Sequence, residues 1–147
     1  MSGIPQVQRF FRAAGGVDVD KDDVKRYREF VDDKVDDIAI AARDTAKWNG
    51  RDVIAPQDLP LTKGLQERMR EFATMDEAED LRRLLRASLR RPPDEITFGE
   101  ETEDVLAEVF GGISVALART FRIIDESVRN PNTAHWDRVF ALSRLLL

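Results

Sequence analysis

The side chains that most often carry catalysis are few and scattered in this chain. His135 is the single histidine, cysteine is absent, and no serine is spaced with a histidine and an acid as a nucleophilic set. His135 lies beside Trp136 in the turn that starts a helix, where packing or capping is the expected role. Because no glycine-rich loop follows a strand, a nucleotide cradle is not expected. We therefore expect a non-enzymatic protein with no cofactor and no small-molecule substrate.

A cluster of carboxylates is the nearest approach to a metal site. It consists of two pairs spaced four residues apart, Asp32 with Asp36 and Asp33 with Asp37. Carboxylate oxygens are the ligands that hard cations prefer. On a helix, however, these side chains diverge around the axis, and no loop or glycine turn gathers them. Together with Lys34 they are typical of a solvated helix face, so no metal site is expected.

Arginines provide the other chemical signal. Arg82, Arg86 and Arg90 recur every four residues, with Arg83 and Arg91 beside them. Such a stripe has two interpretations: a surface for phosphates, or a solvated face in which Glu79 pairs with Arg83 and positive charge suits the helix C-terminus. The whole chain carries 23 basic and 28 acidic residues, a net charge of −5. An acidic balance disfavours tight, sequence-independent binding to nucleic acid.

Composition also limits the compartment. No apolar run approaches the length needed to cross a bilayer, and the first residues lack the basic and apolar regions of a secretory signal. The absence of cysteine removes disulfides and thiolate zinc sites. We expect a cytoplasmic protein that does not act at membranes.

Two long helices are predicted by apolar residues spaced three and four apart. The first spans Asp22–Trp48, begins at an N-cap formed by Asp20 with Asp23, and stops at Asn49-Gly50. The second spans Glu100–Arg129 and ends at Asn130-Pro131-Asn132. Its start, Thr97-Phe-Gly-Glu100, reads as a capping box.

Shorter helices flank each long one. They are expected at Gln6–Ala14, from Pro56 onward, at Met75–Arg90 after a capping box at Thr74–Glu77, and at Ala134–Leu147. The order is short, long, short, and then the same again, which predicts an all-α protein with an internal repeat. Gly111-Gly112 inside the second long helix indicates a close helix crossing, because glycine there costs about 1 kcal/mol. Trp48 and Trp136 are expected in the core.

The first half resembles archaeal histones from Ile4 to about Met69. The matching pieces follow in the family's order: Arg9-Phe-Phe-Arg12, Ala13-Ala-Gly15, Val19-Asp-Lys-Asp-Asp23, Ala39-Ile-Ala-Ala42, Ala46-Lys-Trp-Asn-Gly-Arg51 and Ile54-Ala-Pro-Gln-Asp58-Leu59. In the second half, Thr133-Ala-His-Trp-Asp137 repeats the start of the last helix, with Asp137 at the place of Asp58. The whole chain resembles single-chain bacterial histone-fold pseudodimers.

The resemblance implies a fold and one specific contact. Two tandem histone folds, residues 4–73 and 74–147, would pair within one compact domain, 1–147, and their long helices would cross as in a histone dimer. A structural clamp is implied between Arg51 and Asp58, because the family joins an arginine and an acid across this turn. The second half has no arginine at the clamp position.

The resemblance also implies candidate DNA-binding residues. Arg9 stands at the family's minor-groove position and Arg12 one turn further; the full candidate set is Arg9, Arg12, Arg51, Arg82, Arg86, Arg90 and Arg91. Asp18 and Asp52, however, replace residues that the family uses at phosphates. Two hypotheses follow: a structural or protein-interaction module whose partner is a protein or a second copy, or a nucleoid DNA-binding protein of weak, salt-sensitive affinity.

Overall fold

The computed structural model describes residues 3–89 and 96–147 and is predominantly helical, so the all-α prediction is confirmed. The elements of the first half are α1 (Ile4–Gly15), α2 (Lys21–Trp48), the strand β1 (Val53–Ile54), a 3-10 turn η1 (Pro56–Asp58) and α3 (Lys63–Ala73). Those of the second half are α4 (Ala78–Ser88), the strand β2 (Thr97–Phe98), α5 (Glu100–Ile124) and α6 (Thr133–Leu146). None of the described helices is long and apolar enough to span a bilayer.

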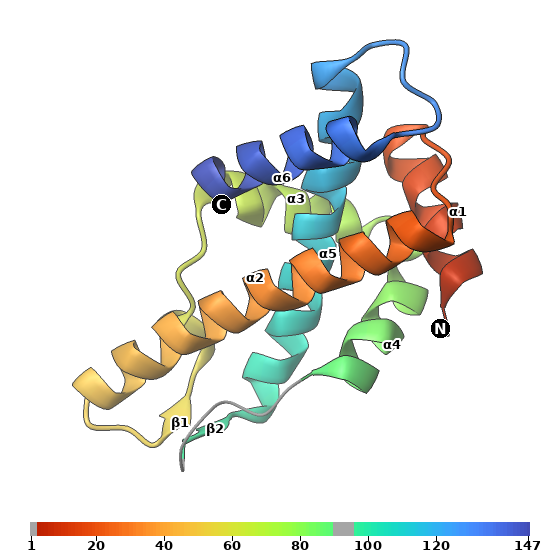
Figure 1. The fold of residues 1–147 in the computed structure, drawn as a ribbon. Helices are drawn as coiled ribbons and strands as arrows, with labels where there is room; N and C mark the ends of the chain where they lie inside the picture. The colour runs from red at the N-terminus through yellow and green to blue at the C-terminus, as the bar shows by residue number, and fades with distance from the viewer. Residues whose placement is uncertain (1–2, 90–95) are drawn as a thin grey trace.

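The two long helices, α2 and α5, cross near the middle of the molecule (Figure 1). The N-terminus of α2 forms as predicted: the Asp20 side chain accepts from the Asp23 N–H, and the Asp23 side chain accepts from the Asp20 N–H. At its other end Gly50 adopts a left-handed φ of 73°, which glycine reaches without a steric penalty.

The loops at both ends of the crossing are paired. β1, which follows α2, lies parallel to β2, which precedes α5. At the other end the Asp18 N–H, before α2, donates to the Arg129 carbonyl, after α5, at 2.7 Å. The loop before each long helix therefore contacts the loop after the other, and the two halves are joined reciprocally.

Aromatic residues from both halves fill the core. Phe11 meets Tyr27 edge-on at 4.9 Å between ring centres, and Phe121 meets Trp136 at 4.7 Å. The buried Tyr27 hydroxyl lies 2.6 Å from Ser114 Oγ, which satisfies a polar group that would otherwise be costly to bury. Because these contacts join α1 and α2 to α5 and α6, neither half has a separate core.

Close packing explains the glycine pair in α5. A β-carbon on Gly111 would collide with the ring of Phe72, and one on Gly112 would lie 2.7 Å from Met69 Cγ. Both neighbours belong to α3, so the predicted close crossing of helices is confirmed. The two tryptophans divide: Trp136 is fully buried as expected, but Trp48 is 90% exposed and its assignment to the core was wrong. Trp48 is the last residue of α2, beyond the part of that helix that α5 covers.

Two predicted capping boxes were wrong. Thr97 lies in β2, where its N–H donates to the Asp52 carbonyl, and α5 is preceded by Gly99 without a side-chain cap. Thr74 ends α3 instead of starting α4, because its hydroxyl donates to the Glu71 carbonyl. In both cases the threonine bonds to a carbonyl outside the helix that it was predicted to cap. Thr97 bonds to the loop before β1, and Thr74 bonds to the end of α3.

Two helix boundaries also differ from the prediction. The second long helix ends at Ile124 rather than Arg129, because the Asp125 side chain accepts from the N–H and hydroxyl of Ser127 and turns the chain. Pro56 starts only the short turn η1. The α-helix that follows begins at Lys63, with the Thr62 hydroxyl accepting from the Leu65 N–H.

Candidate functional site

The turn between α2 and α3 contains the Arg51–Asp58 pair implied by the resemblance. The two guanidinium NH groups donate to the two carboxylate oxygens at 2.7 and 2.6 Å, and the Ala55 N–H donates to the same carboxylate at 2.8 Å. The Asp58 side chain is 2% exposed and that of Arg51 36%. Hydrogen bonding from Arg51, aided by the Ala55 N–H, lowers the pKa of Asp58. Arg51 is thus engaged inside the protein.

The corresponding turn of the second half is held differently. Asp137 is exposed and has no polar contact within the described residues. Instead His135 Nδ1 accepts from the Asn132 N–H at 3.0 Å, which leaves the hydrogen on Nε2 to donate to Asp125 at 3.0 Å. This contact with His135 lowers the pKa of Asp125. The capping role expected for His135 is confirmed, whereas Asp125 was missed because it lies ten residues away with no local signal.

The candidate DNA-binding arginines of α1 are paired with acids. Arg9 lies 3.7 Å from the Asp80 carboxylate on α4, and Arg12 donates to Asp18 at 3.0 Å. The acid at position 18, noted in the sequence for replacing a basic residue, thus also neutralises one. Hydrogen bonding from Arg12 lowers the pKa of Asp18.

The arginine stripe of α4 is largely neutralised as well. Arg82 binds Glu108 on α5 at 2.6 Å and Glu79 at 3.3 Å, while Arg86 lies 3.5 Å from Asp104. Arg83 pairs with Asp80. The expected Glu79–Arg83 pair is therefore wrong, because Glu79 contacts Arg82. Arg90 and Arg91 lie outside the described residues.

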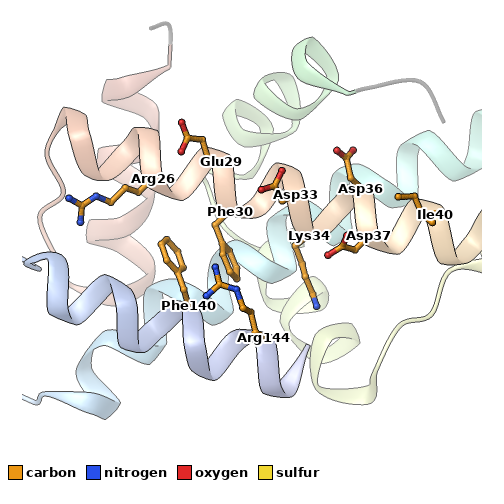
Figure 2. A pocket seen from close by; sticks show the side chains of 10 residues that line it. All are labelled: Arg26, Glu29, Phe30, Asp33, Lys34, Asp36, Asp37, Ile40, Phe140 and Arg144. Atoms are coloured by element: carbon orange, nitrogen blue, oxygen red, sulfur yellow. The ribbon is translucent and has the colours of Figure 1, made fainter. Parts of the chain in front are cut away.

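A groove of about 780 Å³ runs between α2 and α6, and no pattern in the sequence indicated it. Phe30 and Phe140 stack at 4.3 Å between the two helices, and Arg144 lies over the Phe30 ring at 5.3 Å (Figure 2). The remaining lining residues all come from α2: Arg26, Glu29, Asp33, Lys34, Asp36, Asp37 and Ile40.

The aspartate cluster of α2, Asp32, Asp33, Asp36 and Asp37, does not form a metal site in the described part of the chain. Asp33, Asp36 and Asp37 line the groove, and Asp32 lines a separate depression between α2 and α4. Their side chains leave the helix in different directions, as the spacing predicts. The groove can therefore offer a binding partner an aromatic floor with charged edges.

Comparisons with known proteins identify relatives along nearly the whole chain. The model of a family described as "Domain of unknown function (DUF1931)" matches residues 7–144. An uncharacterized protein of Aquifex aeolicus is 27% identical over 111 residues, which are 76% of this chain and 65% of that protein, so the match spans just under two thirds of that relative's length. A second from the same organism is 26% identical over 133 residues, with 81% of this chain and 77% of that protein covered.

Two solved structures share the fold. One is the crystal structure of a Thermus thermophilus protein whose sequence is 39% identical to this chain. The TM-score is 0.83, and 97% of each chain is covered. An Aquifex aeolicus protein solved at 1.9 Å is 23% identical, with a TM-score of 0.81, 99% of this chain and 95% of that chain covered.

Proposed function

The chain belongs to the DUF1931 family, and we propose that it is a tandem histone-fold pseudodimer that serves as a non-enzymatic protein-interaction module. The support for the histone fold is the reciprocal pairing of its loops. β1 with β2, and Asp18 with Arg129, join the start of each long helix to the end of the other. Two histone folds that pair through their crossed long helices would have the same loop contacts.

The observation that carries the functional part is the pairing of the arginines. In the described residues, Arg9, Arg12, Arg51, Arg82 and Arg86 each lie within 4 Å of a carboxylate. An arginine bound to an internal acid must exchange that partner for a phosphate, so each contact gains little free energy. The surroundings of each of these arginines are therefore poorly suited to a polyanion, and a protein partner is favoured.

One observation favours the alternative, a nucleoid DNA-binding protein. Arg12 and Arg129 both reach Asp18, so two guanidinium groups share one carboxylate beside the paired loops. Both side chains are well exposed, and Arg122 donates to the Gly16 carbonyl nearby. This spot would retain an excess of positive charge and hold a phosphate backbone weakly.

A titration with duplex DNA at low and moderate salt tests the proposal. A handful of phosphate contacts loses affinity steeply as salt rises, so any binding should disappear near physiological ionic strength. We expect no retention of duplex there. Submicromolar binding at that salt, lost on replacing Arg9, Arg82 and Arg86, would contradict the interaction module and favour the DNA-binding alternative. The double variant Arg12→Ala, Arg129→Ala tests the arginines beside Asp18 separately from Arg9, Arg82 and Arg86. Only binding at the Asp18 site should be lost in this variant.

A further inference from the structure

We propose that the groove between α2 and α6 binds a second copy of this chain, so that the protein forms a two-fold dimer. This inference rests on the interaction function proposed above and names its partner. Its basis is the groove's origin, its unpaired charges and the apolar residues beside it.

The groove exists because the two halves pack unequally. On α5, Gly111 and Gly112 let α3 of the first half approach closely. Counted from the N-caps Asp20 and Gly99, the same positions of α2 hold Asp32 and Asp33. Of these two, Asp33 lines the groove, and its side chain does not permit so close an approach by α6. That helix instead meets α2 at the stack of Phe30 on Phe140, and a groove stays open beside the stack.

Charges of both signs line this groove without an opposite charge to pair with in the described part of the chain. Glu29, Asp33, Asp37, Lys34 and Arg144 have no charged partner within the described residues. The arginines of α1 and α4 discussed above, by contrast, are all in ion pairs where the structure describes them. Unpaired groups of both signs indicate a partner that also presents both signs.

The two edges of the groove differ in charge. Glu29 points away from α6 along the α2 edge and Asp33 lies on the same helix, whereas Arg144 comes from α6 on the opposite side (Figure 2). A two-fold axis across the groove places the acidic edge of one copy against Arg144 of the other. The same axis places Arg144 of the first copy against the acidic edge of the second. Such a surface is self-complementary, as a two-fold interface requires.

Exposed apolar residues also lie on the same two helices. Ile40 lines the groove and is 40% exposed, while Leu145 and Leu146 at the end of α6 are 81% and 73% exposed. Leucines so open to water are favourably covered on association. The two helices therefore present a charge pattern that would select the orientation, together with apolar groups whose burial would supply free energy.

Sedimentation equilibrium of the whole chain and of charge-reversed variants tests the inference. The wild type should show a concentration-dependent dimer. Arg144→Glu and Asp33→Lys should each raise its dissociation constant at least about tenfold, because like charges then face each other. An equimolar mixture of the two variants should regain dimer, since each contact is again between opposite charges. Arg138→Glu, at an exposed position of α6 outside the groove, is the matched control.

Leu145→Asp provides a second test that leaves the Arg144–Phe30 contact intact, and it should weaken the dimer similarly. A chain that stays monomeric at every concentration would overturn the inference. So would a dimer that Arg144→Glu leaves unchanged, or variants whose mixture does not reassociate. None of these results bears on the DNA titration, so this surface can fail while the proposed interaction module stands.

Discussion

Arg51 and Asp58 hold the turn after α2 through two parallel hydrogen bonds, and they do so over seven residues of sequence. A contact this local is predictable from pattern alone, because the turn between the two residues fixes their separation. The equivalent turn of the second half is held by His135 and Asp125. No spacing rule predicts that pair, since it depends on where α5 ends.

Asp58→Ala should destabilise the fold. The carboxylate is buried and accepts three hydrogen bonds, whereas the Arg51 that it leaves behind is partly exposed. We expect a loss of about 2–3 kcal/mol, because a buried ion pair is broken but its arginine can be solvated. Thermal unfolding should show the melting temperature falling by roughly 5–10 °C.

Asp137→Ala is the matched control for that measurement. The histone resemblance matches Asp137 to Asp58, yet Asp137 is exposed without a polar partner in the described chain. Its replacement should change stability by less than about 0.5 kcal/mol. Equal melting temperatures for the two variants would mean that Arg51 and Asp58 contribute no clamp.

At the scale of elements, the cores of the helices were predictable, as were the ends of α2, but several other ends were not. Apolar spacing identified α2 and α5, because burial against one face imposes a period near 3.6 residues. Those other ends follow from partners far away in sequence: Thr97 joins β2 through the Asp52 carbonyl, and Asp125 turns the chain toward His135. The groove was missed for the same reason, since it depends on how closely two helices approach.

Gly111→Ala should measure how tightly α3 is seated on α5. The added methyl would collide with the Phe72 ring, which is fully buried and cannot withdraw. We expect a loss of about 1–3 kcal/mol from overpacking, measured by chemical denaturation.

Gly64→Ala serves as the opposite case. Gly64 lies in the first turn of α3 with nothing within 4 Å of a β-carbon. Alanine there should stabilise the protein by about 0.4–1 kcal/mol, because the unfolded chain loses freedom. If both variants were equally stable, close packing at Gly111 would not be the reason for its glycine.

At the scale of the whole molecule, acids and arginines from distant elements neutralise one another. Arg82 reaches Glu108 on α5, and Arg119 of α5 reaches Glu71 on α3. The net charge of −5 was known from the sequence, but these pairings were not, because each joins residues far apart in the chain. The arginine stripe that suggested DNA is thus paired with acids of its own half, and the Arg119–Glu71 pair joins the two halves.

The two halves form one pair, in which each supplies the other's core. Phe11 and Tyr27 of the first half pack on Phe121, Trp136 and Phe110 of the second, so a separated half would expose its aromatic face. A piece of about 73 residues also has little core of its own.

Residues 1–73 expressed alone, and compared with the whole chain by circular dichroism and sedimentation, test this pairing most directly. We predict that the fragment is unfolded or forms a dimer in which a second copy replaces residues 74–147. Adding the separate fragment 74–147 should restore helicity and a cooperative melting transition. A stable, folded monomer of residues 1–73 would contradict the paired fold and, with it, the pseudodimer on which the proposed function is built.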